Sequence, residues 1–199
     1  NGDWSIYEYD GSTIVQPQTF AGVLLHGVAI DELHTANVIP HFTIENFVIG
    51  TAADDILNGT DSNDFIDGMA IWTGSGGQKS GHDRLKGGEG NDVLVGGPHG
   101  HTNGGYYRDT FVYDNKRSGK DTIVDFNVLD ASGNVGLDFR YLDILEIERN
   151  INNSGFQYAN DFLSASSENE DGWAVIYLGS EEMISDITMH GVKLDSITP

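Results

Sequence analysis

Five aspartates in the middle of the chain occupy the same place in a short glycine-rich pattern. The clearest copy reads G-G-E-G-N-D-V-L-V over residues 87–95, and it matches the nonapeptide G-G-x-G-x-D-x-U-x, in which U is a large apolar residue, at every defined position. Four looser copies share its D-x-U ending. The sixth-position residues are Asp55, Asp64, Asp83, Asp92 and Asp109. Their spacings of 9, 19, 9 and 17 residues alternate one nonapeptide with a step close to two.

The residue types in this pattern are those that bind a hard cation. Glycines allow positive φ angles and close stacking, so the glycine-rich half of each copy forms a tight turn whose carbonyl oxygens face one side. The aspartate adds a carboxylate to these carbonyls. Ligands that are all oxygen, six or more in number, suit calcium better than magnesium or zinc.

The second half of each copy is a three-residue strand with one inward-pointing apolar residue. These residues are Leu57, Ile66, Leu85, Leu94 and Phe111. A single unit buries almost nothing, whereas stacked units share a core and a column of ions.

The stretch resembles the β-roll of the RTX (repeat-in-toxin) family of secreted bacterial proteins. In that family two nonapeptides form one coil, and each calcium ion lies between turns n and n+2 on one edge. The resemblance implies that Asp55 pairs with Asp83, Asp64 with Asp92, and Asp83 in turn with Asp109. It also implies calcium ligands, mostly backbone oxygens, at Gly59, Asp61, Gly81, Gly87, Glu89 and Gly90.

The repeats depart from the family pattern in two places. Ala53 and Ser62 replace the fourth-position glycine of the first two copies, and Gln78 and Lys79 replace the first two glycines before Asp83. We expect these half-sites to bind calcium weakly or to stay empty. Asp121 fits two interpretations equally well, as a further ligand near the last half-site or as a plain aspartate at the start of a strand.

The flanks of the repeats also resemble secreted proteins of this type. The segment I-E-N-F-V-I-G-T at 44–51 is similar to the coil that precedes RTX repeats. D-T-F-V-Y at 109–113 and K-D-T-I-V-D-F at 120–126 are similar to the segment that follows the roll in serralysin-type proteases and other type I secreted proteins. Apolar residues at helical spacing predict one short helix near 156–166.

We therefore predict an all-β fold, a parallel β-roll capped by N-terminal and C-terminal β-strands. The predicted parts are an N-terminal β cap over 1–49, the calcium-binding roll over 50–112 and a C-terminal capping and secretion region over 113–199. Segments 68–77 and 96–107 interrupt the roll, and we interpret them as loops, although each could be a degenerate coil. Their aromatic residues Trp72, Tyr106 and Tyr107 could stack on sugar rings, but we favour a role in covering the flank of the roll.

Composition excludes several classes of function. The 199 residues carry 31 acidic and 10 basic side chains, a net charge of −21, which disfavours nucleic acid as a partner. The chain has no cysteine, so we expect a bound metal, in place of disulfides, to stabilise the fold. No apolar run reaches the ~18 residues of a membrane span, and the first residues show no signal-peptide pattern, which favours a fragment of a longer chain or another route of export.

No catalytic motif accompanies the repeats. The sequence lacks H-E-x-x-H, G-x-S-x-G, a phosphate-binding glycine loop and any thiol, so we predict that it is not an enzyme. The expected function is that of a calcium-binding C-terminal domain of a larger secreted protein, folding outside the cell after export by type I secretion machinery. The alternative is a calcium-scaffolded module that binds a polysaccharide or cell surface, as the R-modules of alginate epimerases do.

Overall fold

The computed structural model describes the chain in segments. Residues 44–68, 81–97, 107–114, 117–128, 142–179 and 185–197 are described in full, and short strands at 4–9, 12–17, 23–25, 71–72 and 78–79 by their backbone. The chain divides into two compact units, Asn1–Phe42 and Thr43–Pro199. The first unit contains an antiparallel sheet of β1 (Trp4–Tyr9), β2 (Ser12–Pro17) and β3 (Val23–Leu25).

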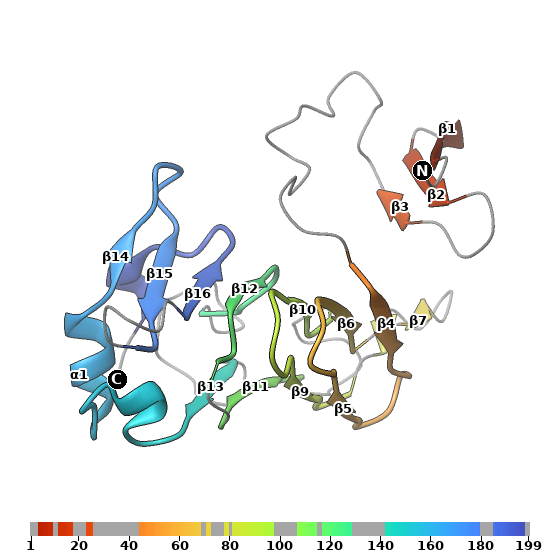
Figure 1. Cartoon of the computed structure of the whole chain (residues 1–199). Coiled ribbons are helices and arrows are strands. Elements are labelled where there is room, and N and C mark those ends of the chain that lie inside the picture. Colours follow the sequence, from red (N-terminus) through yellow and green to blue (C-terminus); the bar gives the residue numbers. More distant parts are fainter. Residues whose placement is uncertain are drawn as a thin grey trace. The chain divides into compact units, whose positions relative to one another are not determined.

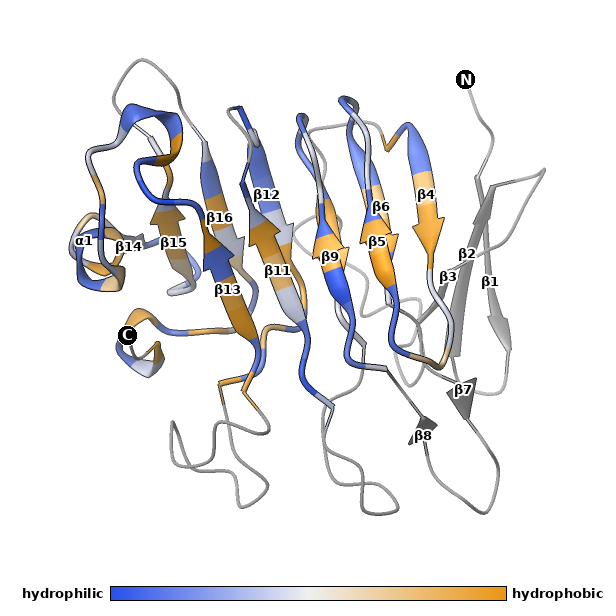
Figure 2. Ribbon diagram, turned by 90° about the horizontal axis from the view of Figure 1, so that it is seen from below, coloured by the Kyte–Doolittle hydropathy of each residue, from blue (hydrophilic) through white to orange (hydrophobic). Residues whose placement is uncertain are grey.

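The strands of the second unit alternate between two sheets that lie face to face (Figures 1 and 2). One sheet contains, in parallel, β4 (Asn46–Ile49), β6 (Asp64–Asp67), β10 (Val93–Val95), β12 (Lys120–Ile123) and β16 (Asp186–Met189). The other contains, also in parallel, β5 (Ile56–Asn58), β9 (Arg84–Lys86), β11 (Thr110–Tyr113) and β13 (Ile144–Ile147). Each coil takes one strand from each sheet, which confirms the predicted parallel β-roll.

The C-terminal elements extend and close the roll. Strands β14 (Ser167–Glu168) and β15 (Ala174–Tyr177) add to β16 in antiparallel fashion, so the first sheet reaches seven strands while the second stops at four. Helix α1 (Ala159–Ser164) lies inside the range predicted for a helix, between the short 3-10 helices η3 (Ile151–Asn153) and η4 (Leu194–Ser196). None of the helices in the described segments is long and apolar enough to cross a bilayer.

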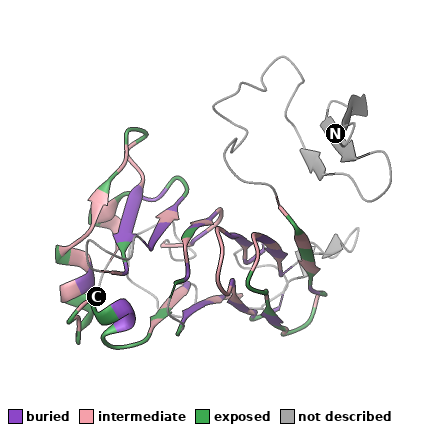
Figure 3. Cartoon of the chain, viewed as in Figure 1, coloured by how far each residue is buried: buried purple, intermediate pink, exposed green. Residues whose placement is uncertain are grey.

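The core of the roll is two ladders of apolar side chains. In the four-stranded sheet Leu57, Leu85, Phe111 and Leu145 lie in register, and in the seven-stranded sheet Val48, Ile66, Leu94, Ile123 and Met189 do so. The middle members of both ladders are fully buried (Figure 3). Since one large apolar residue per strand points inward, the eighth position of each nonapeptide supplies the core, as predicted.

Each of the two insertions widens one turn of the roll, and the two lie in different turns. In the unbroken copies the first glycine packs against the carboxylate of its own sixth-position aspartate, as Gly87 does against Asp92. Gly68 stands in the same relation to Asp83, and Gly96 to Asp109. Each long spacing is therefore one widened turn and adds no coil. Within the first insertion, β7 (Ile71–Trp72) and β8 (Gln78–Lys79) pair antiparallel.

The predicted division into three parts remains a prediction. The compact unit that holds the roll begins at Thr43, and β4 already belongs to its seven-stranded sheet. At the other end β12, β13 and β16 continue both sheets beyond residue 112.

The core ladder can be tested on the four-stranded sheet. Leu85 is 0% exposed between Leu57 and Phe111, so Leu85→Ala should lower the free energy of unfolding by about 2–5 kcal/mol. The matched control is Ile56→Ala on the neighbouring strand, where the side chain is 75% exposed and the expected change is within about 0.5 kcal/mol. Urea denaturation at saturating calcium measures both, and equal effects of the two substitutions would contradict the assigned faces of the sheet.

Candidate metal-binding site

The sixth-position aspartates stack in two columns, one at the start of each sheet's strands. In the Asp55 column the backbone N–H of each aspartate donates to Oδ1 of the aspartate one coil later. These bonds join Asp55 to Asp83 (2.9 Å), Asp83 to Asp109 (2.9 Å) and Asp109 to Asp143 (2.8 Å). In the Asp64 column the same bonds join Asp64 to Asp92 (2.8 Å) and Asp92 to Asp121 (2.9 Å). The structure thus brings together every pair that the resemblance implied.

The fifth-position residues connect the same coils in the opposite direction. Here the side chain of the earlier coil accepts from a backbone N–H of the later one. Asp54 accepts from His82 (2.9 Å), Asn63 from Asn91 (2.8 Å) and Asn91 from Lys120 (2.8 Å). Two consecutive residues therefore tie each coil to both of its neighbours, which fixes the stacking distance of the turns.

Three of the stacked carboxylates keep a buried oxygen with unused acceptor capacity. Within the described segments the Oδ2 atoms of Asp83, Asp92 and Asp121 are buried and accept no hydrogen bond. By contrast, Oδ2 of Asp64 accepts from the Thr60 N–H and Oδ2 of Asp143 from the Asn127 N–H. An anionic oxygen that is buried without a partner is costly. A cation is the group that would satisfy it.

Burial also changes how readily these carboxyls ionise. Loss of solvation, reinforced by the neighbouring carboxylates, raises the pKa of Asp83 to about 6, that of Asp92 to about 7 and that of Asp109 to about 8. The pKa values of Asp121 and Asp143 are raised well above the ordinary range for the same reasons. Backbone hydrogen bonds to these carboxylates act in the opposite direction but do not outweigh burial. The ionised form of these carboxyls is therefore costly in the fold unless a proton or a cation neutralises it.

The turn of the complete repeat stacks directly on the turn before it. The Glu89 N–H donates to the Thr60 carbonyl (3.1 Å), and the Gly59 N–H to the Lys86 carbonyl (2.8 Å). Glycine is required at two places in this stack, because Gly88 and Gly90 have φ of +114° and +115° and lie against the carbonyls of the turn 59–64. A hollow between these turns is lined by Asn58, Gly59, Thr60, Asp61, Lys86, Gly88 and Glu89.

The predicted ligands take distinct places around these turns. Gly59, Asp61 and Glu89 line the hollow, Gly87 and Gly90 belong to the stacked turn 87–92, and Gly81 packs against the Ala53 carbonyl in the Asp55 column. The Asp61 side chain is exposed, so any contribution of this residue would come from its backbone. Within the described segments no three His, Asp or Glu side chains gather at one point. A cation here would therefore take two carboxylates and several backbone carbonyls, a hard all-oxygen set that fits calcium.

Sequence reasoning missed Asp143, which ends the Asp55 column. It starts D-I-L at 143–145, the same D-x-U ending as the repeats, but no glycine-rich turn precedes it and 34 residues separate it from Asp109. The D-x-U ending alone could have found it. Asn46 was missed because it is not an aspartate. It stands where the Asp64 column would continue, and its Nδ2 donates to Asp64 Oδ1 (2.8 Å).

A buried asparagine from the C-terminal region holds the turn that carries Asp121. Asn152, 1% exposed, accepts from the Arg117 N–H (3.0 Å) and donates through Nδ2 to the Leu178 carbonyl (3.0 Å). It joins the end of the Asp64 column to η3 and to the end of β15. The C-terminal elements therefore support the last turn of the roll.

The residues considered for sugar binding are only partly within the described segments. Tyr107 lies with its ring centroid 6.3 Å from that of His82. Trp72 is described by its strand backbone alone, and Tyr106 lies outside the described residues. A glycan-binding surface on the insertions stays a prediction.

Comparison with known families agrees with the geometry of the columns. Residues 45–70 and 79–98 match the family model of the RTX calcium-binding nonapeptide repeat, in four copies. These ranges hold the turns of Asp55, Asp64, Asp83 and Asp92, and the matched repeats are calcium-binding repeats. The comparison with curated proteins finds no relative that matches this chain.

Asp92 gives a sharp test of the columns. Asp92→Asn keeps the Oδ1 acceptor for the Asp64 N–H but removes the charge and the free oxygen. We expect calcium affinity to fall about tenfold or more, which is about 1.4 kcal/mol, because the charge and the free oxygen are both lost. Asp171→Asn, which removes the charge of an exposed side chain outside the roll, is the control and should leave calcium affinity unchanged. Isothermal titration measures the effect, and an unchanged calcium affinity of Asp92→Asn would contradict the assignment.

The raised pKa values predict that acid can partly replace calcium. Because the folded-state pKa of Asp83, Asp92 and Asp109 exceeds that of an unfolded aspartate, near 4, these groups stabilise the calcium-free fold when protonated, and that stability is lost as pH rises through about 6 to 8. In chelator the chain should therefore gain β-structure as the pH falls from about 8 to about 5. Circular dichroism in chelator across this range measures the change. A calcium-free spectrum that is the same at pH 5 and pH 8 would contradict the shifts.

Proposed function

We propose that this chain is a non-catalytic, calcium-binding C-terminal part of a larger secreted bacterial protein, and that calcium met after type I export makes it fold. The observation that carries the proposal is the set of buried carboxylate oxygens on Asp83, Asp92 and Asp121 that accept no hydrogen bond from the described residues. Calcium-binding repeats supply the chemical identity of the ion. The flanking segments that resemble type I secreted proteins supply the route of export.

The negative charge of the turns explains why the chain would fold only when calcium is bound. At neutral pH the acidic turns repel one another, and burial of the aspartate columns adds a desolvation cost. The 26 glycines of the chain also raise the conformational entropy that folding must overcome. At cytosolic calcium concentrations the unfolded chain is favoured, which suits export through a secretion channel. Outside the cell, calcium at roughly 10⁻⁴–10⁻³ M, the range of weak extracellular sites, reverses the balance.

The Asp64 column and the Asp55 column would not bind calcium equally well. The turns 59–64 and 87–92 stack with the full set of glycines on one side, whereas the turn before Asp83 has Gly68 as its first glycine and is widened by the insertion that holds β7 and β8. We infer that ions enter the Asp64 column first and that this column orders the strands of both sheets, since each coil shares its core with the next.

Circular dichroism in chelator and in calcium tests the proposal. In excess chelator at pH 7.5 the chain should give a coil-like far-ultraviolet spectrum and an expanded radius of gyration. Calcium at millimolar concentration should convert the spectrum to that of β-structure and compact the chain, with a midpoint between about 10⁻⁴ and 10⁻³ M. Magnesium at the same concentration is the control and should give little change, because it resists dehydration and demands octahedral geometry. Identical β-rich spectra in chelator and in calcium would overturn calcium-driven folding.

A further inference from the structure

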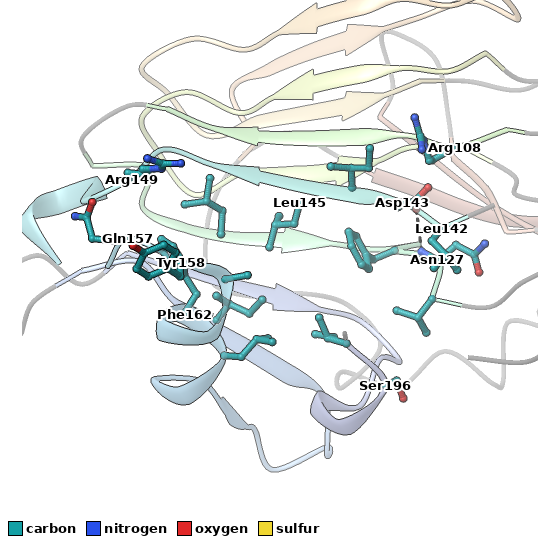
Figure 4. Close-up of a pocket in the computed structure, with 18 residues that line it drawn as sticks. Arg108, Asn127, Leu142, Asp143, Leu145, Arg149, Gln157, Tyr158, Phe162 and Ser196 are labelled. Atoms are coloured by element: carbon teal, nitrogen blue, oxygen red, sulfur yellow. Dashed lines mark hydrogen bonds between the residues drawn. The ribbon is translucent and has the colours of Figure 1, made fainter. Parts of the chain in front are cut away.

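A cavity lies at the C-terminal end of the roll, where Asp143 ends the Asp55 column. It has a volume of about 480 Å³, within the range of small-molecule sites. Its apolar wall includes Phe126, Leu145, Ile147, Phe162, Ile176 and Ile197. In Figure 4 Leu145 lies on β13, the last strand of the four-stranded sheet, and Phe162 on helix α1.

The topology explains why a cavity forms here. The four-stranded sheet ends at β13, while the seven-stranded sheet continues through β16, β15 and β14. Inward-facing residues of β13 therefore meet no strand of a following coil, and α1 with its neighbours covers them. Since α1 has only six residues, it fills only part of the space. Phe156 and Phe162, whose ring centroids are 4.9 Å apart in an edge-to-face pair, brace the covering segment.

Polar groups are confined to the two ends of the cavity. At one end are Arg149, Gln157 and Tyr158, and at the other Arg108, Asn127 and Asp143 (Figure 4). Arg149 is exposed and makes no ion pair with another residue of the described segments. It is one of only 10 basic residues in a chain of net charge −21. A guanidinium at the mouth of an apolar cavity is complementary to an anion that carries an apolar body.

The acidic groups near this end are occupied elsewhere. Asp161 Oδ2 accepts the N–H groups of Gln157 (2.8 Å) and Tyr158 (2.9 Å), the start of α1, so this carboxylate is held by the helix backbone. Asp143, at the far end, accepts from Asp109 and Asn127. We propose that the cavity binds an amphipathic carboxylate, with its linear alkyl chain between β13 and α1 and its head group on Arg149.

Decanoate is the probe, and the protein is the full chain at saturating calcium, so failure of calcium-driven folding would show separately in its spectrum. We expect saturable one-to-one binding by isothermal titration. Arg149→Gln should weaken it about fivefold to tenfold while leaving the melting temperature unchanged, because the side chain is exposed. The matched control, Arg84→Gln, removes the same charge from the outer face of the four-stranded sheet, where Arg84 pairs with Glu146, and should not change decanoate affinity.

Two further arms test the apolar half of the site. Leu163→Trp and Ala159→Leu both add volume to the wall from α1, and each should abolish binding. Two variants are used so that the test still holds if one of them misfolds. Ala159→Leu should fold, since Ala159 is exposed on the first turn of the helix. Decan-1-ol, the uncharged analogue, should bind more weakly than decanoate and be insensitive to Arg149→Gln.

Several outcomes would overturn the proposal. These are no saturable decanoate binding, equal binding by the folded Leu163→Trp and Ala159→Leu variants, or equal affinity for decanoate and decan-1-ol. Binding to phosphatidylglycerol vesicles without binding to monomeric decanoate would also overturn it and identify a membrane surface instead. Sedimentation of a dimer that Leu163→Trp dissociates would show that a second copy of the chain covers the cavity.

Discussion

Buried carboxylates stacked one coil above another are the constraint on which the rest of the structure depends. After the first member of each column, every aspartate accepts the N–H of its counterpart in the preceding coil, so its position follows from the stacking of the strands. The same stacking removes water from Asp83, Asp92 and Asp121 and leaves one oxygen of each without a hydrogen bond within the described segments. The geometry that builds the roll therefore also creates its demand for a cation.

The apolar ladders and the aspartate columns are two results of one nine-residue period. The eighth position supplies one inward side chain per strand, and the sixth supplies one carboxylate per turn. Because the two positions are two residues apart, both point to the same face of the strand. Each aspartate column therefore runs beside an apolar ladder, which explains why burial raises the pKa of its carboxyls so strongly. Core and ion column cannot form independently of each other.

Much of this arrangement could be predicted from the sequence because it is periodic. The D-x-U endings at Asp55, Asp64, Asp83, Asp92 and Asp109 predicted the stacked units and their inward residues, and the resemblance to the RTX family implied the parallel roll and the aspartate pairs. What the sequence did not reveal was where the period is hidden by insertions. The 34 residues between Asp109 and Asp143 conceal a further coil, and the widened turns between Gly68 and Asp83 and between Gly96 and Asp109 leave the coil count unchanged. Neither the role of Asn152 nor the C-terminal cavity has a periodic signal, since both depend on tertiary packing.

A crystal structure of the calcium-loaded chain, with an anomalous difference map, tests the central claim most directly. The account predicts calcium peaks between the stacked turns 59–64 and 87–92, with oxygen ligands at about 2.3–2.6 Å that include a carboxylate oxygen of Asp92. Ordered turns with no anomalous peak between them, or with Asp92 turned away from the neighbouring coil, would contradict it.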